Sequence, residues 1–529
     1  MRAFLLALIL SLCGLLPASA ASATAWRITS DHWSPADEEG FGRFVTALGE
    51  SGCSSSESCL RSAANPWRGS DNGFVDVDVD CAKLPYLLRA YYAWKNGLPF
   101  SYVDGLSGSG DPRFSKTPNH PVSRNDVVDH GGGINGPKAL REMLDTVYTA
   151  TYRTDAGQTR GVPSDFYAPA LRPGSIRPGT VIYDTNGHVG LVYKVDASGR
   201  VYYMDAHPDF TISRSVYGAQ FGQSPMGLGG GLKNWRPLQL VGAHAQGGVL
   251  VGGHITLAAN NQIGDFSLVQ YLGTDRTADG RPAFSYNGAP LGFYEYVRVA
   301  VSGGRTDFNP VFELEATMKT LCNDLNDRAQ YVNQATANGI SAKLHPAAIP
   351  ANIYLSDDND WESYATPARD ARLKAGFIQF RHDLHDMIAL WLARDPRIVY
   401  DGQFLKQDLL AAYDRESRAC NITYLSSDKR PVPLSFDNIS HRLFAMSFDP
   451  YHCVELRWGD DSAACPDQAA KRRWYAQEAR ARAEIGSDEG SPTQIAGPAD
   501  VDIRGLIASM PERVPFVQPM PGGAPVTLH

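Results

Sequence analysis

The sequence lacks several features that would each identify a large class of proteins. It has no glycine-rich loop of the type that binds nucleotide phosphates and no internal repeat. After its first twenty residues it has no apolar run long enough to span a bilayer. Its net charge of -8 and pI near 5.9 give it no excess of positive charge. These absences argue against a phosphate-loop enzyme, a repeat scaffold, a membrane-spanning protein and a protein whose main partner is nucleic acid or an anionic membrane.

The one strongly apolar segment lies at the N-terminus. A basic Arg2 precedes the apolar run Phe4 to Leu16, and the small-residue pattern Ala18-Ser19-Ala20 follows. This layout is typical of a secretory signal peptide. We therefore expect residues 1–20 to be a signal peptide, and the mature protein to be exported.

Cysteine is scarce, with eight in 529 residues, and Cys13 would leave with the signal peptide. Seven cysteines is an odd number for a compartment in which thiols tend to oxidise. Proximity favours pairing Cys53 with Cys59 and Cys453 with Cys465, which leaves Cys322 with Cys420 by elimination, although six cysteines allow fifteen connectivities. Cys81 then remains unpaired. The alternatives are a buried, inert thiol or a different pairing.

Cys81 lies at the predicted start of an amphipathic helix. Apolar residues recur every three or four positions after it, and Asn96-Gly97 supplies a stop signal. The positive end of the helix dipole favours a thiolate, which is the nucleophilic form of cysteine. We expect Asp80 to cap this helix, while the nearby carboxylates oppose the effect of the dipole.

A predicted hairpin supplies a base and an acid. Strands are expected at Thr180 to Tyr183, His188 to Val195 and Arg200 to Ala206. If Val195 pairs with Arg200, His188 faces His207, and Asp205 lies diagonally from His188. A one-residue slip would change these pairs.

A cysteine, a histidine and an acid of this kind are the nucleophile, base and orienting group of a thiol hydrolase. The catalytic residues predicted are Cys81, His188 and Asp205, with His207 as the alternative orienting residue. Such a mechanism needs neither a metal nor a cofactor. The alternative is that His188 is an ordinary strand-edge histidine and Asp205 a turn residue.

These segments resemble the NlpC family of secreted papain-like cysteine peptidases. The matching residues are Asp80-Cys81 with Asn96-Gly97-Leu98-Pro99, the strand Pro178-Gly179-Thr180-Val181-Ile182-Tyr183, and Gly187-His188-Val189-Gly190-Leu191-Val192-Tyr193. The resemblance covers about residues 75–208 and implies a peptide or peptidoglycan substrate, a papain-like fold and a periplasmic or secreted protein. It departs from the family after the cysteine, where Ala82-Lys83-Leu84-Pro85 replaces the usual Ser-Gly.

Leu98 to Gly105 and Tyr203-Met204-Asp205-Ala206 are also similar to transglutaminase-like proteins, which use the same three residue types in the same order. Three functions therefore remain open. The first is hydrolysis of an amide bond, with peptides of cell-wall peptidoglycan as the expected substrate. The second is transfer of an acyl group to an amine. The third is a non-catalytic binding or scaffold role in the cell envelope.

The predicted fold class is α+β. We expect a papain-like domain with an antiparallel sheet over residues 24–240, a β-rich insertion or small domain over 241–304, a disulfide-containing helical domain over 305–490 and a tail over 491–529. Phe266 to Tyr271 and Tyr294 to Val301 alternate like strands, and Trp235 to Leu238 resembles an edge strand. Helices are predicted at 311–334, 368–393 and 403–418, with a charged, exposed helix at 471–484. The pair His382 and Asp386 could suggest a metal site, but a solvated helix face explains it better.

Overall fold

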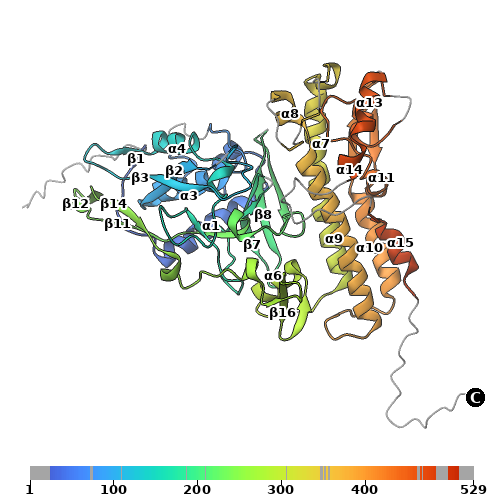
Figure 1. The fold of residues 1–529 in the computed structure, drawn as a ribbon, viewed down its shortest axis with the longest axis horizontal. Coiled ribbons are helices and arrows are strands. Elements are labelled where there is room, and N and C mark those ends of the chain that lie inside the picture. The colour runs from blue at the N-terminus through green and yellow to red at the C-terminus, as the bar shows by residue number, and fades with distance from the viewer. Residues whose placement is uncertain are drawn as a thin grey trace, which may run out of the picture.

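The computed structural model describes residues 24–71, 76–108, 110–185, 187–208, 210–305, 307–345, 349–350, 353–354, 358–461, 465–467, 469–483 and 499–511. The predicted signal peptide lies outside these residues. The described chain forms a sheet half, which contains the N-terminal segments, and a helical half, which begins near residue 310 (Figure 1). The described chain combines helices with antiparallel sheets, which confirms the α+β class.

A six-stranded antiparallel sheet organises the first half. Its strand order is β5-β10-β6-β7-β8-β9. The strands are β5 (Phe166–Tyr167), β10 (Gly231–Trp235), β6 (Val181–Asp184), β7 (His188–Val195), β8 (Val201–Ala206) and β9 (Ile212–Val216).

Helices cover both faces of this sheet. Helices α1 (Pro35–Glu50) and α3 (Lys83–Asn96) share a core with Leu191, whereas α6 (Phe293–Val301) shares a second core with Val192. Successive side chains of a strand point to opposite faces, so β7 is buried on both sides. That explains why its sequence reads as a nearly continuous apolar run.

The turn before α3 holds Cys81 in place. Asp80 accepts hydrogen bonds from the Lys83 N–H through its carboxylate (3.0 Å) and from the Leu84 N–H through its carbonyl (3.1 Å). Asp80 therefore stabilises the turn before the helix, but the N-cap position is Ala82 rather than the predicted Asp80, because regular helix begins two residues after Cys81. Gly97 ends the helix in the left-handed conformation, with φ of 66°.

The β7–β8 hairpin differs from the prediction at its loop and agrees with it near the site. Val195 pairs with Val201 rather than with Arg200, which makes the loop one residue longer. A bulge between Val192 and Lys194 then shifts the register back, so that Leu191 pairs with Met204 as predicted. The two differences cancel, and Asp205 still lies diagonally from His188.

The remaining elements of the sheet half are short. Four pairs of strands are β1 (Ala25–Trp26) with β4 (Ile134–Asn135), β2 (Phe100–Ser107) with β3 (His120–Val127), β11 (Leu238–Val241) with β14 (His254–Leu257), and β12 (His244–Gln246) with β13 (Val249–Val251). A three-stranded sheet contains β15 (Asp275–Arg276), β16 (Pro282–Tyr286) and β17 (Ala289–Leu291) in that order. Short helices are α2 (Ser56–Arg61), α4 (Gly136–Leu144) and α5 (Val269–Leu272).

Three local predictions in this half are wrong. The run Tyr294 to Val301 is helical, because its buried positions recur at helical spacing and pack on the sheet. The segment Phe266 to Tyr271 contains the helix α5 rather than a strand. Trp235 ends a strand that pairs on both sides, with β5 and with β6, so it is not in an edge strand.

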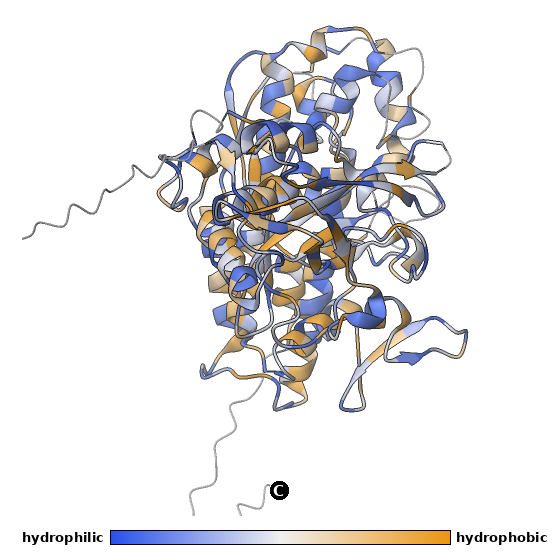
Figure 2. Cartoon of the chain, turned by 90° about the vertical axis from the view of Figure 1, so that its left-hand side faces the viewer, coloured by the Kyte–Doolittle hydropathy of each residue, from blue (hydrophilic) through white to orange (hydrophobic). Residues whose placement is uncertain are grey.

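Long helices build the second half. They are α7 (Pro310–Ala337), α9 (Pro367–Leu392) and α10 (Leu405–Ala419), which confirm the three helices predicted there. Shorter elements are α8 (Asn359–Tyr364), β18 (Ile422–Leu425), β19 (Pro431–Leu434), α11 (Phe436–Arg442), α12 (Val454–Arg457), α13 (Ala469–Gln477), α14 (Ala479–Ala483) and α15 (Ile503–Ser509). Apolar side chains on the facing sides of α7, α9 and α10 form a separate core, and apolar and polar segments alternate along the helices in Figure 2.

Two predictions in this half need correction. The charged segment after Lys471 is not uniformly exposed, since Glu478 and Arg482 are buried. The C-terminal stretch contains α15, whose Ile503 and Ile507 are buried in the helical core, so this part is not a tail.

All three predicted disulfides are confirmed. Cys53 pairs with Cys59, Cys322 with Cys420 and Cys453 with Cys465. Among the described residues, Cys81 is the free cysteine, and it is buried. No helix in the described ranges has the length and apolarity that a bilayer span requires.

Candidate functional site

His188 and Asp205 meet where β7 begins and β8 ends, and Cys81 lies beside Gly187. The Cys81 thiol lies 3.8 Å from the carbonyl oxygen of Gly187, the residue that precedes His188. Tyr152 fixes the turn that carries Cys81, because its hydroxyl donates a 2.6 Å hydrogen bond to the Ala82 carbonyl. The helix start and the strand start are thus held against each other.

His188 and Asp205 are in direct contact. The His188 Nε2 atom lies 2.5 Å from Asp205 Oδ2, and both side chains are buried. The second carboxylate oxygen of Asp205 accepts a 2.6 Å hydrogen bond from the Ser213 hydroxyl on β9. The carboxylate is therefore fixed at both oxygens and holds the imidazole in one orientation.

His207 does not orient His188. Its ring stacks on that of His188 with the centroids 5.7 Å apart, and its Nε2 atom lies 3.0 Å from the Ser213 hydroxyl. Of the two orienting residues considered, Asp205 makes the hydrogen bond.

The protonation states follow from burial and from the charged neighbours. Burial and the Asp80 carboxylate raise the pKa of the Cys81 thiol, against the expectation from the helix dipole. Burial and the Arg372 cation lower the pKa of His188, and this effect outweighs the contact with Asp205. Burial opposes ionisation of Asp205, but His207, His188 and Ser213 hold its pKa below the usual range. At neutral pH the site therefore contains a thiol, a neutral imidazole and a carboxylate.

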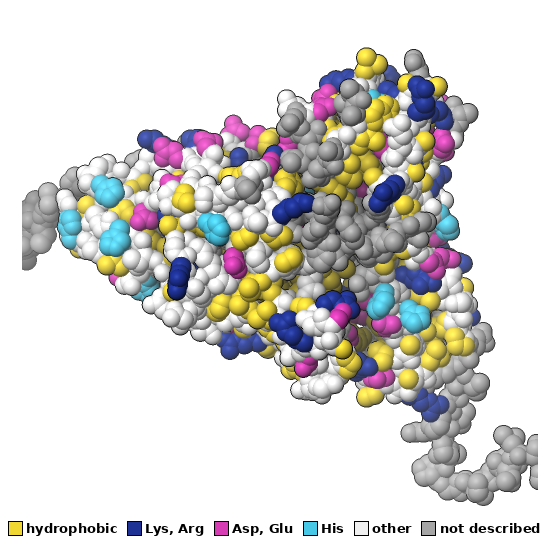
Figure 3. Space-filling model, in the orientation of Figure 1, with side chains coloured by type: hydrophobic (Ala, Val, Ile, Leu, Met, Phe, Trp, Pro, Cys, Tyr) yellow, Lys and Arg dark blue, Asp and Glu magenta, His cyan; other side chains and the backbone are white. Residues whose placement is uncertain are grey.

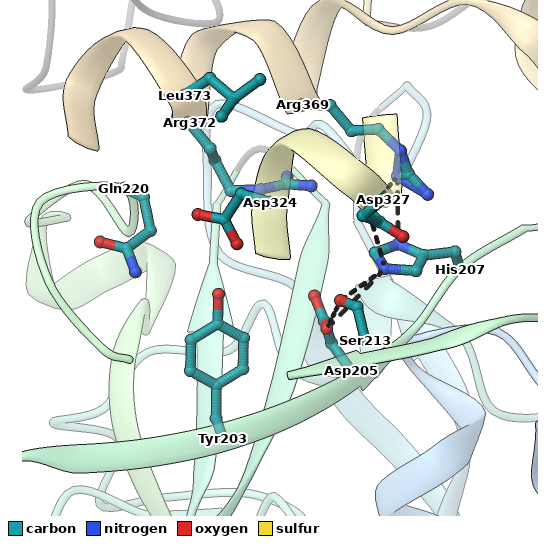
Figure 4. A pocket seen from close by; sticks show the side chains of 10 residues that line it. All are labelled: Tyr203, Asp205, His207, Ser213, Gln220, Asp324, Asp327, Arg369, Arg372 and Leu373. Carbon is teal, nitrogen blue, oxygen red and sulfur yellow. Dashed lines mark hydrogen bonds and ion pairs between the residues drawn. The ribbon is translucent and has the colours of Figure 1, made fainter. Parts of the chain in front are cut away.

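The helical half forms one wall of a pocket beside Asp205. Figure 4 shows Asp324 and Asp327 of α7 and Arg369 and Arg372 of α9 facing the strand side chains. Helix α7 packs against β9. Arg369 Nη1 lies 3.2 Å from His207 Nδ1, and Asp327 Oδ2 lies 3.3 Å from His207 Nε2. The site is thus covered by a part of the chain more than a hundred residues away in sequence.

Sequence reasoning missed the residues that surround the predicted three. Ser213 could have been found from strand alternation, because it lies opposite Asp205 in the β8–β9 pair. The four charged residues on α7 and α9 carry no local signal, since charged residues are ordinary on helices. Only the packing of the two halves brings them to the site.

Three groups of side chains in the described residues have donor atoms close enough together for a metal. Cys453, Cys465 and Asp467 form one, but its two sulfurs are joined in a disulfide. His188, Asp205 and His207 form another, beside the cations Arg369 and Arg372, which disfavour a metal cation there. The third consists of His345, Asp449, His452 and Glu478 in the helical half. The pair His382 and Asp386 is exposed and has no third ligand among these groups.

Comparisons of this chain with protein-family models, with curated proteins and with solved structures found no match.

Proposed function

We propose that this protein is an exported cysteine hydrolase that cleaves amide bonds, with Cys81 as the nucleophile, His188 as the base and Asp205 as the orienting acid. The observation that carries the proposal is the 2.5 Å contact of His188 with Asp205 beside the turn that holds the one free thiol of the described chain. The resemblance to the NlpC family suggests peptides of cell-wall peptidoglycan as the substrate.

The chemistry follows from the orientation of the imidazole. Because His188 Nε2 contacts the ionised Asp205, its Nε2 carries the proton and Nδ1 is the basic nitrogen. Nδ1 removes the thiol proton as the sulfur attacks the carbonyl carbon, and the proton then passes to the amine leaving group as the C–N bond breaks. Water next attacks the thioester, releases the acid product and restores the thiol.

The burial of the site places a condition on this mechanism. Cys81 and His188 are each only 8% exposed. The charge of Arg372 on α9 acts on the pKa of both residues, so the helical half lies close to them. Entry of a peptide therefore requires a movement of the residues that bury the thiol and the imidazole.

The test compares full-length protein with the variants Cys81→Ala and His188→Ala. Peptidoglycan fragments and synthetic stem peptides serve as substrates, and new amino groups are measured over time. We expect both variants to lose at least 100-fold in rate, because general base catalysis alone contributes about 10²–10⁴-fold. His244→Ala is the matched control, since this histidine is exposed on β12 in the same half. Cleavage that survives Cys81→Ala would overturn the proposal.

The transglutaminase-like alternative uses the same thioester but a different acceptor. Adding a primary amine and identifying the products by mass separates the two, because transfer yields a substituted amide whereas hydrolysis yields an acid. A binding or scaffold role predicts no turnover, together with slow labelling of Cys81 by a thiol reagent.

A further inference from the structure

We propose that His345, Asp449, His452 and Glu478 form a structural site for a divalent transition metal, with zinc as the ion that the ligands fit best. This site belongs to the helical half and is independent of the thiol chemistry proposed above. One ligand atom from each of the four side chains lies within 4.8 Å of all the others.

The distances within the cluster are close to those of a tetrahedral zinc site. Zinc binds histidine nitrogen and carboxylate oxygen at about 2.0–2.2 Å, which places neighbouring ligand atoms of a tetrahedron about 3.3–3.6 Å apart. Asp449 Oδ2 lies 2.8 Å from His345 Nε2 and 3.8 Å from His452 Nε2. Glu478 Oε1 lies 3.3 Å from His452 Nε2. These separations lie on both sides of the tetrahedral value, so small movements would complete the site.

Asp449, His452 and Glu478 each use one atom for a contact outside the cluster, whereas His345 Nε2 contacts Asp449 Oδ2 and His345 Nδ1 has no hydrogen-bond partner. Asp449 Oδ1 accepts a 2.7 Å hydrogen bond from the Tyr451 N–H, which leaves Oδ2 for the cluster. Glu478 Oε2 accepts one from the Ser447 hydroxyl at 3.1 Å, which leaves Oε1. His452 Nδ1 lies 3.0 Å from Asp467 Oδ2, so the other ring nitrogen points inward. A carboxylate behind a histidine is the usual support for a metal ligand.

Two of the inner atoms are buried without a hydrogen-bond partner. The side chains of His452 and Glu478 have no exposed surface. His452 Nε2 and Glu478 Oε1 form an ion pair with each other at 3.3 Å, but neither atom makes a hydrogen bond. Buried polar atoms in proteins are nearly always satisfied, so each such atom requires an explanation. A cation at the centre of the cluster would coordinate both atoms, while Glu478 Oε2 stays paired with Arg482 Nη1 at 3.5 Å.

The ligand types indicate zinc rather than calcium or magnesium. Two imidazoles suit zinc and its neighbours, whereas calcium and magnesium prefer oxygen ligands alone. All four ligands come from the protein and are almost completely buried, which is typical of a closed structural site rather than a catalytic one. The ion would join His345 after α7, the turn at Asp449 and His452, and Glu478 between α13 and α14.

The experiment measures zinc binding by the full-length protein. The protein is first stripped with a chelator, then titrated with Zn²⁺ against a chromophoric competitor, and its bound metal is determined by mass spectrometry. We expect one Zn²⁺ per chain, and a rise in the midpoint of thermal unfolding when zinc is added. In Glu478→Gln and His345→Asn, zinc affinity should fall at least 100-fold and the thermal shift should disappear.

Two control variants and a spectrum make the test independent of folding defects. His382→Asn removes the exposed histidine beside Asp386, whereas His188→Ala alters the other histidine cluster. Both variant proteins should still bind one Zn²⁺ per chain. Wild-type protein loaded with Co²⁺ should show the intense visible bands of tetrahedral coordination. Absence of binding in the wild type, an octahedral cobalt spectrum, or binding unaffected by both ligand variants would overturn the proposal.

Discussion

The two halves of this protein assemble their buried titratable groups in different ways. In the sheet half, His188 and Asp205 are 17 residues apart and lie on neighbouring strands, so strand pairing alone brings them together. In the helical half, His345 and Asp449 are 104 residues apart and meet only because separate segments pack around them. The comparison teaches that a site built on a hairpin is visible in sequence, whereas a site built between loops and helix ends is not.

The comparison extends to the surface. Figure 3 shows histidine side chains at the end of the sheet half that lies away from the helices, where β12 and β14 carry the exposed His244 and His254. The buried histidines of the described chain also have acidic neighbours, as His188 and His452 illustrate, but so do exposed histidines such as His32 and His382. Burial, rather than the carboxylate neighbour, therefore distinguishes the candidate functional histidines from the surface ones.

The largest expected effect concerns how strongly each half depends on its disulfide. Cys322 and Cys420 enclose a separation of 98 residues, and Cys53 and Cys59 one of 6. The chain-entropy relation gives about 4.7 kcal/mol for the long loop and about 2.2 kcal/mol for the short one. Replacing each pair by serine should therefore destabilise the protein more in the helical half. Urea unfolding with a chelator present measures both losses, and equal losses would contradict the prediction.

A buried ion pair in the helical half should be nearly as important. Arg328 Nε lies 2.5 Å from Asp370 Oδ1, and the two side chains are 0% and 1% exposed. Arg328→Met leaves a buried carboxylate without its cation, which should lower the free energy of unfolding by about 3–5 kcal/mol. The control is Arg281→Met, which breaks an exposed pair in the sheet half and should leave stability almost unchanged. Similar values from urea unfolding of the two variants would argue against this contrast.

A smaller effect is expected from the residue that positions Asp205. Ser213→Ala removes the hydrogen bond to Asp205 Oδ1 but leaves the contact of Oδ2 with His188. A hydrogen bond to a charged group contributes about 1.5–3 kcal/mol, part of which should appear in the transition state. We expect kcat on a stem peptide to fall about tenfold with little change in KM. Ser213→Thr keeps a hydroxyl and should restore most of the rate, whereas failure of that rescue would indicate a merely structural role.

The smallest effect is a shift of the pH profile. Burial and Arg372 lower the pKa of His188 below its ordinary value of 6.5. The imidazole thus stays neutral and basic at pH 6.5, and kcat/KM should fall only as the pH drops below that value. Arg372→Gln removes the cation, so the acidic limb should move to higher pH. A limb above pH 6.5 in the wild type, or a shift to lower pH in the variant, would contradict this assignment.

Much of the architecture followed from the sequence because the signals are local. The three long helices of the second half show their apolar period over many residues, and their predicted ranges agree with the structure to within three residues. The disulfides followed from proximity and elimination. The segment Tyr294 to Val301 was misread because β-branched and aromatic residues favour strands, while its packing against the sheet selects a helix.

The sequence by itself determined the hairpin, and with it the contact of His188 with Asp205, because strand alternation and pairing act over a few residues. Only the tertiary structure decided that Cys81 is buried with a raised pKa, that α7 and α9 cover the site, and that four distant side chains gather around one point in the helical half. Burial and long-range electrostatics depend on which surfaces meet, and that information is distributed over the whole chain.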